Sequence, residues 1–170
     1  MGIVSFFKEA GEKLFGSKDT EAAAAAAAQA PSQADLQERA RAANDAAAKA
    51  IEKYIAAQSL TADGLAVEFD GASSAVTVSG QAADQATKEK ILLCCGNVQG
   101  VASVSDLMTV AQPADESQYH TVVRGDTLSA IAKKFYGNAN LYPKIFEANK
   151  PMLSNPDKIY PGQLLRIPPN

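Results

Sequence analysis

The sequence contains one histidine and only two cysteines, and this scarcity restricts the chemistry that the chain can perform. A zinc centre needs three or four His, Cys or carboxylate ligands, so a lone His120 beside an adjacent cysteine pair does not predict one. Cys94 and Cys95 have Cα atoms about 3.8 Å apart, which would strain a disulfide between them. We expect two reduced thiols that act as small hydrophobic residues near the end of a buried helix.

Catalytic motifs are also missing. His120 has no serine or cysteine partner in its sequence neighbourhood, so we interpret it as a surface residue rather than a general base. The acidic residues are scattered and do not suggest a carboxylate pair in a cleft. Gly96 and Gly100 lack the preceding strand and following helix of a phosphate-binding loop. We therefore do not expect an enzyme.

Charge and hydropathy exclude further classes. The formal net charge is -3 and the sequence pI is about 5.2, without the concentrated basic face that nucleic-acid binding requires. No apolar run is long enough to suggest a membrane span. The opening sequence MGIVSFFKEAGEKLF has no basic leading region, and charged residues interrupt its apolar ones. We expect a cytoplasmic protein.

Residues 1–31 are predicted to form a short helical segment followed by a linker. In residues 1–15, Ile3, Phe7, Ala10 and Leu14 recur at helical spacing, which predicts an amphipathic segment that packs on the next domain. Residues 16–31 are rich in alanine and small polar residues, which is typical of a linker.

Residues 32–111 form the first predicted domain. Ser32 and Asp35 have the spacing of a capping box, and a helix follows to residue 59. Its predicted buried stripe is Ala43, Ala47, Ala50, Ile51, Tyr54 and Ile55. A hairpin is expected over 65–78, then a helix over 84–95 that ends at a left-handed Gly96, and a strand over 101–110. This α-β-β-α-β order predicts a mixed sheet with helices on one face.

A second small domain is predicted after a linker at residues 112–118. Residues 119–170 contain an alternating strand, a helix start at 125–129, a second helix that ends at 149–151, and a closing strand. A Pro161-Gly162 turn precedes that closing strand. The sequence therefore predicts an α+β protein of two small domains.

Both domains resemble known families. The segment YHTVVRGDTLSAIAKKFYGNANLYPKIFEANKPMLSNPDKIYPGQLLRIP is similar to LysM modules, which are β-α-α-β domains that usually bind N-acetylglucosamine chains. Residues 33–111 resemble the BON domain, through VTVSG at 76–80, ATKEKI at 86–91 and GNVQGVASV at 96–104. The order of elements carries this second resemblance more than any single motif.

The connection after residue 96 has features that suit a cation held by neutral oxygens alone. It follows a helix C-terminus, where the last carbonyls lack intrahelical partners and the helix dipole favours positive charge. Neutral carbonyl oxygens suit potassium, whereas calcium normally takes several carboxylates, which do not cluster here.

The whole architecture resembles cytoplasmic bacterial potassium-binding proteins with a BON domain followed by a LysM domain. The opening motif AGEKL at 10–14, KEKIL at 88–92 and the LysM stretch carry this resemblance. It implies potassium binding through main-chain carbonyls. By motif, the ligands would be those of Phe7, Ala10, Glu12, Gly96, Val98 and Val101.

We therefore predict a monomeric potassium sensor or buffer in which the ion orders the N-terminal segment and docks LysM on BON. The alternative is a cell-wall glycan-binding protein. Its predicted groove is formed by Gly125, Asp126, Thr127 and Leu128 on one side and Ile159, Tyr160, Pro161 and Gly162 on the other. These groove residues also have structural interpretations, as a helix cap, a core residue and a turn. A third hypothesis is a scaffold whose LysM domain contacts another protein.

Overall fold

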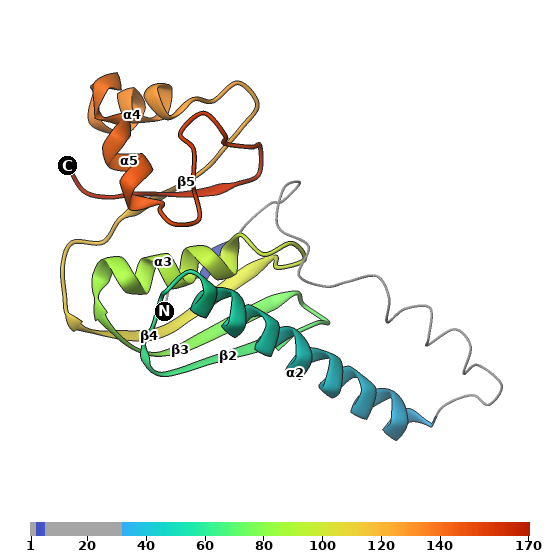
Figure 1. The fold of residues 1–170 in the computed structure, drawn as a ribbon. Helices are drawn as coiled ribbons and strands as arrows, with labels where there is room; N and C mark the ends of the chain where they lie inside the picture. The colour runs from blue at the N-terminus through green and yellow to red at the C-terminus, as the bar shows by residue number, and fades with distance from the viewer. Residues whose placement is uncertain (1–2, 6–31) are drawn as a thin grey trace.

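The computed structural model describes residues 3–5 and 32–170. The candidate ligands Phe7, Ala10 and Glu12 and the predicted linker 16–31 lie outside the described residues. The described chain forms a four-stranded sheet with two helices, followed by a two-stranded sheet with two helices and a short 3-10 helix (Figure 1). The predicted α+β class with two small domains is confirmed.

Helix α2 (Gln33–Ala57) begins at the predicted capping box. The Asp35 N–H donates to Ser32 Oγ at 3.2 Å, and the Ser32 N–H donates to the Asp35 carboxylate at 3.1 Å. The first turns are exposed and project beyond the sheet, whereas the later turns cover it (Figure 1). The predicted stripe was wrong at Ala43, which is exposed because it precedes the sheet; Ala48 is buried instead.

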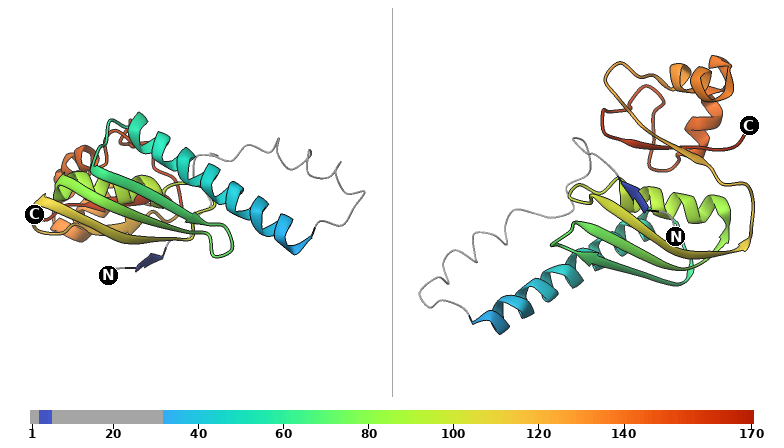
Figure 2. Two further views of the ribbon diagram at one scale, coloured as in Figure 1. Left: turned by 90° about the horizontal axis from the view of Figure 1, so that it is seen from below. Right: turned by 180° about the vertical axis from the view of Figure 1, so that it is seen from behind.

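The larger sheet contains β1 (Ile3–Ser5), β2 (Asp63–Asp70), β3 (Ala75–Asp84) and β4 (Ser103–Gln112) in the order β1-β4-β3-β2. Strands β3 and β4 are parallel, and the other two pairs are antiparallel, so the sheet is mixed as predicted. Helix α3 (Gln85–Gly96) connects the parallel pair. Both helices cover the same face of this sheet (Figure 2).

The start of the chain differs from its prediction. Residues Ile3–Ser5 form a strand rather than a helix, and they pair with Ser105–Ser103 of β4. Ile3 and Val4 are β-branched and favour the extended backbone, and the edge of β4 supplies hydrogen bonds that an isolated short helix lacks. The predicted packing of the rest of residues 1–15 lies outside the described residues.

The end of α3 also differs. Gly96 was predicted to adopt the left-handed conformation that ends the helix, but Gly96 is helical and Asn97 is the C-cap with φ of -91°. The left-handed backbone occurs four residues later, at Gly100, where φ is +94°. The main-chain turn is therefore spread over the whole connection between α3 and β4.

The smaller domain follows the predicted order. Its elements are β5 (Gln118–Thr121), α4 (Leu128–Tyr136), the 3-10 helix η1 (Ala139–Leu141), α5 (Tyr142–Ala148) and β6 (Leu164–Ile167). Strands β5 and β6 are antiparallel. Leu165 and Ile167 of β6 pack into the core of this domain with residues from both helices.

The two domains share packing at their junction. Leu164 of β6 belongs to the buried core of the BON domain, and Tyr119 and Met152 pack against that core. Helix α3 therefore lies between the larger sheet and the LysM domain, which rests on the opposite side of the helix (Figures 1 and 2). This arrangement brings β6 next to the C-terminal end of α3.

Candidate functional site

The connection between α3 and β4 is fixed by two buried valines. The Val98 and Val101 side chains are 0% and 2% exposed and belong to the BON core, whereas Gln99 and Gly100 between them are exposed. Burial of both valines holds the main chain of this turn in place at the protein surface. Predicted ligands Gly96, Val98 and Val101 are thus brought together in one rigidly anchored turn.

Hydrogen bonds leave part of this turn free. The N–H groups of Asn97, Val98 and Val101 donate to the carbonyl oxygens of Leu93, Cys95 and Val98, at 3.0, 3.2 and 3.2 Å respectively. No main-chain N–H of the described residues donates to the carbonyl oxygen of Gly96 or Val101. Within the described residues, two peptide oxygens therefore have no main-chain donor, and a third, on Val98, has a second lone pair.

This donor set fits a weakly hydrated monovalent cation. The oxygens are uncharged, and they lie just beyond the C-terminus of α3, where the helix dipole places partial negative charge. Such oxygens can replace the hydration shell of potassium, whereas calcium and magnesium normally bring carboxylate ligands. Across residues 3–5 and 32–170, no group of three or more His, Cys, Asp or Glu side chains is arranged to hold a metal ion.

Strand β1 ends beside the turn between α3 and β4. It runs antiparallel to β4, so its last residue, Ser5, lies opposite Ser103, the first residue of β4. The chain therefore leaves β1 at the end of the sheet where the three described candidates lie.

The other side of the turn contacts the LysM domain. The Asn97 side chain donates through Nδ2 to the Leu164 carbonyl oxygen at 3.1 Å, and the Leu164 N–H donates to Asn97 Oδ1 at 2.9 Å. One turn earlier in α3, Cys94 Sγ lies 3.2 Å from Met152 Sδ of the LysM domain. The candidate turn is therefore bonded directly to strand β6.

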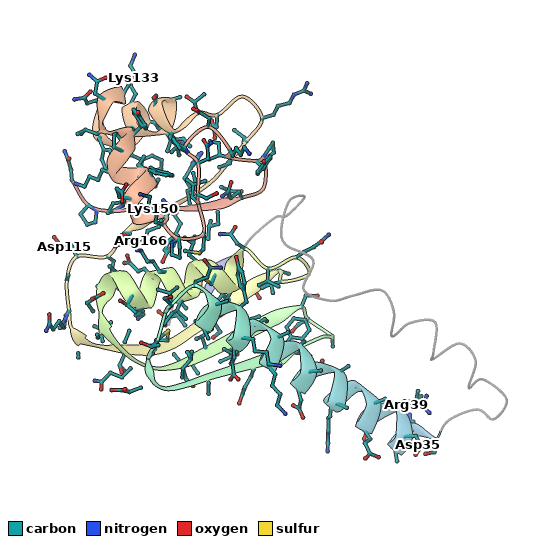
Figure 3. The ribbon with its side chains drawn as sticks, viewed as in Figure 1. Asp35, Arg39, Asp115, Lys133, Lys150 and Arg166 are labelled. Carbon is teal, nitrogen blue, oxygen red and sulfur yellow. The ribbon has the colours of Figure 1, made fainter. Side chains whose placement is uncertain are left out.

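A buried ion pair also joins the two domains near the start of α3. Arg166 Nε of β6 donates to Glu89 Oε2 at 2.5 Å, and these side chains are 9% and 3% exposed. Figure 3 shows Arg166 between the LysM domain and α3. Glu89 Oε1 also accepts from Gln85 Nε2 at 2.9 Å and from the Ser117 N–H at 2.8 Å. One carboxylate thus joins α3, the interdomain linker and β6.

The environment of Glu89 keeps it ionised. Burial by itself raises the pKa of Glu89, but hydrogen bonds from Gln85, Ser117 and Arg166 to the charged form outweigh burial, and its pKa lies below the ordinary value. Nearby, burial and the negative charge of Glu89 raise the pKa of Tyr119, whose hydroxyl is buried without a hydrogen-bond partner among the described residues.

Sequence reasoning missed Asn97, Glu89 and Arg166. Lys88-Glu89-Lys90 has the appearance of a solvated helix face, and Glu89 is buried only because another domain covers it. A signal was present in β6, where Leu164 and Leu165 point to opposite faces of the strand. Apolar residues on both faces indicate a strand that is covered on both sides.

Main-chain hydrogen bonds connect the two loops of the predicted glycan groove. The Val122 N–H donates to the Gln163 carbonyl at 2.8 Å, and the Gly162 N–H donates to the Val122 carbonyl at 2.8 Å, which joins its two loops. Of the groove residues, Gly125, Tyr160 and Pro161 are exposed, Asp126, Ile159 and Gly162 are half-buried, Thr127 caps α4 and Leu128 is a core residue.

His120 is not the surface residue that the sequence suggested. Its Nε2 lies 2.7 Å from Asp126 Oδ2, and its ring meets Phe135 edge-on at 5.7 Å between centroids. Asp126 also accepts the Val123 N–H at 3.0 Å. Burial by itself raises the pKa of Asp126, but these hydrogen bonds outweigh burial, and its pKa lies below the ordinary value. The bonds of Asp126 to His120 and Val123 fix the groove loop.

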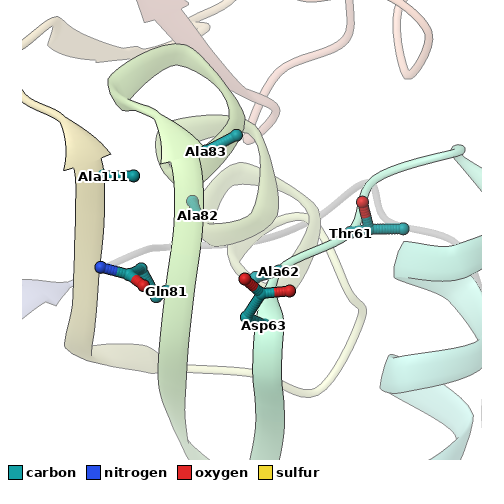
Figure 4. Close-up of a pocket in the computed structure, with 7 residues that line it drawn as sticks. All are labelled: Thr61, Ala62, Asp63, Gln81, Ala82, Ala83 and Ala111. Atoms are coloured by element: carbon teal, nitrogen blue, oxygen red, sulfur yellow. The ribbon is translucent and has the colours of Figure 1, made fainter.

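A shallow hollow lies at the far end of the larger sheet. Its volume is about 110 Å³, and it is lined by Thr61, Ala62, Asp63, Gln81, Ala82, Ala83 and Ala111 (Figure 4). Asp63 is its one titratable side chain, so it contains no carboxylate pair for acid–base chemistry. Ala111 is near the end of β4 and the candidate turn is at its start, so the hollow and the turn are separate.

Known proteins match this chain in both domains. The BON domain matches residues 42–112, and the LysM domain matches residues 120–168. A protein of Escherichia coli O6:H1 named potassium binding protein Kbp is 46% identical over 168 residues, which cover 99% of each chain. This chain belongs to the Kbp family.

Other relatives share only parts of this Kbp family chain. An uncharacterized protein of Deinococcus radiodurans is 44% identical over 82 residues, which cover 42% of this chain and 32% of that protein. The Mycobacterium tuberculosis esterase Rv1288 is 52% identical over 48 residues, which cover 28% of this chain and 10% of the esterase. Among the described helices, none has the length and apolar character needed to cross a membrane.

We expect removal of either partner of the Glu89–Arg166 pair to destabilise the domain junction. Glu89→Gln or Arg166→Met leaves one buried polar partner uncompensated, so each should lower the free energy of unfolding by about 3–5 kcal/mol. The double variant should lose less than the sum, because no unpaired charge remains. Urea unfolding of the four proteins measures this coupling. Glu147→Gln, which breaks the exposed pair with Lys150, is the control and should cost below about 1 kcal/mol. Additive losses would contradict the prediction.

The same pair should make the stability of the domain junction depend on pH in the acid range. Because the pKa of Glu89 is lowered in the folded protein, its stabilising effect is complete above the ordinary glutamate value of 4.5 and is lost as the pH falls through the folded pKa. Stability measured from pH 7 to pH 3 should fall more steeply in the wild type than in Glu89→Gln. Parallel curves for the two proteins would show that Glu89 is not the titrating group.

Proposed function

We propose that this protein binds potassium through main-chain carbonyl oxygens and has no catalytic role. The observation that carries the proposal is the anchored turn between α3 and β4, where the oxygens of Gly96 and Val101 are free of described amide donors. The full-length similarity to a protein named for potassium binding supports it. Val98 completes the described half of the ligand set, and Phe7, Ala10 and Glu12 of the N-terminal segment supply the rest.

The bound ion joins segments that are distant in sequence. It holds residues 7–12 against the turn after α3, and the turn is bonded to the LysM domain through Asn97. Binding free energy then adds to the stability of the docked, ordered state and depends on ion concentration. Such a protein acts as a potassium sensor or buffer, and we place it in the cytoplasm as a monomer.

Potassium should raise the melting temperature of the protein more than sodium at equal ionic strength. At a free potassium concentration of about 100 times Kd, the stabilisation is about 2.7 kcal/mol. Deletion of residues 6–15 should abolish this response while keeping β1. Deletion of Ala22–Ala28 is the matched control, because it shortens the same region without removing a candidate ligand. Equal stabilisation by the two ions, or an unchanged response after the 6–15 deletion, would reject the proposal.

A second candidate function is glycan binding in the LysM groove. Tyr160 is 54% exposed although the domain is docked on α3, so a stacking surface remains open beside the two joined loops. If the groove is used, chitooligosaccharides should give a calorimetric binding signal that Tyr160→Ala weakens at least tenfold. A titration without heat in the potassium-bound and potassium-free protein would exclude this function.

A further inference from the structure

Asn97 occupies a special place in the candidate turn. It is the C-cap of α3, directly between Gly96 and Val98, and its own N–H donates to the carbonyl oxygens of Leu93 and Cys94 at 3.0 and 3.2 Å. Its side chain meanwhile extends to the LysM domain and pairs with both main-chain groups of Leu164. One residue thus connects the candidate oxygens of one domain to the backbone of the other.

The main-chain bond of Asn97 sets the direction of a candidate oxygen. A peptide unit is planar and trans, so its N–H and C=O point in opposite directions. The Asn97 N–H points back into α3, and the Gly96 carbonyl of the same peptide unit therefore points off the end of the helix. A rotation about the Asn97 backbone bonds would therefore both turn the Gly96 carbonyl oxygen and displace Val98.

The side-chain bonds prevent such a rotation. The Asn97 side-chain amide donates to the Leu164 carbonyl and accepts from the Leu164 N–H, as the backbone of a neighbouring strand would. Asn149 makes the same paired contact with Arg166, at 2.8 Å in both directions. The main-chain N–H and C=O groups of residues 164 and 166 point to the same edge of β6. The Asn97 and Asn149 side chains therefore cover the edge that faces away from β5.

We propose that Asn97 is a positioning residue for the potassium site, and that strand β6 of the LysM domain sets the geometry of its oxygens through the Asn97 amide. This inference rests on the proposed function. Selectivity among alkali ions with neutral ligands depends on how many oxygens the protein holds in place and on how it holds them. An anchored Asn97 keeps the turn from closing around the smaller sodium ion.

Loss of the Asn97–Leu164 hydrogen bonds can be separated from loss of the contact between the LysM domain and α3. Glu89 is eight residues before Asn97, about 12 Å along the helix, and it holds Arg166 and the linker independently. Leu164 is buried in the BON core, and this burial should persist when the Asn97 side chain is shortened. Asn97→Ala should therefore release the turn while the LysM domain stays on α3.

The test compares Asn97→Ala with Gln99→Ala, an exposed amide in the same turn. By calorimetry, Asn97→Ala should lower potassium affinity at least tenfold, which is about 1.4 kcal/mol, and should reduce the ratio of potassium to sodium affinity. Gln99→Ala should bind as the wild type does. Hydrogen exchange without ion provides a second readout: the Leu164 N–H should lose protection in Asn97→Ala, whereas the N–H of Arg166, held by Asn149, and that of Ser117, held by Glu89, should keep it.

Unchanged affinity and selectivity in Asn97→Ala would overturn the inference. Loss of Ser117 protection would also overturn it, because Asn97 would then act by docking alone. If the alanine variant does not fold, Asn97→Asp replaces it, with Gln99→Asp as its charge control; the aspartate keeps the bond from the Leu164 N–H and loses the other. A wild type that does not distinguish potassium from sodium would instead reject the proposed function.

Discussion

Strand β6 connects nearly every feature of the domain junction, because its four residues are engaged on both faces and both edges. One face sends Leu165 and Ile167 into the LysM core, and the other sends Leu164 into the BON core. One edge pairs with β5, and the other meets the amides of Asn97 and Asn149. A short two-stranded ribbon is marginal in water, so these contacts explain how it stays ordered.

The Glu89–Arg166 pair has a different role from the apolar contacts around it. Burying two charges removes them from water, and their attraction often only balances that loss, so the pair need not add net stability. It does make wrong arrangements unfavourable, since any shift of β6 along α3 would leave a buried charge without a partner. Gln85 and the Ser117 N–H also donate to Glu89, and Asn149 exchanges two hydrogen bonds with the Arg166 main chain, which fixes the same register. The ion pair therefore specifies position, while Leu164 supplies hydrophobic burial.

The sequence predicted local structure well where one short-range rule applied. Ser32 and Asp35 marked a helix start, and Pro161-Gly162 marked a turn, because the bonds that form them lie within four residues. Ile3–Ser5 was predicted wrongly, because its strand depends on β4, about a hundred residues away. Asn97, Glu89 and Arg166 were missed for the same reason: each has a polar side chain whose partner belongs to another domain. The proposed ligand set could be suggested only by family resemblance, since main-chain oxygens leave no side-chain motif.

A site made of peptide oxygens must obtain its geometry from residues that do not touch the ion. Side-chain ligands carry their own directional preference, but a carbonyl points wherever its backbone is held. In this turn, burial of Val98 and Val101 in the BON core fixes the backbone, and the Asn97 side chain fixes it through hydrogen bonds to Leu164. The two valines belong to the same domain as the turn, so their packing does not depend on the position of the other domain. Asn97 differs, since its bonds exist only when β6 is in place, so in the proposed site the geometry of the oxygens depends on domain docking.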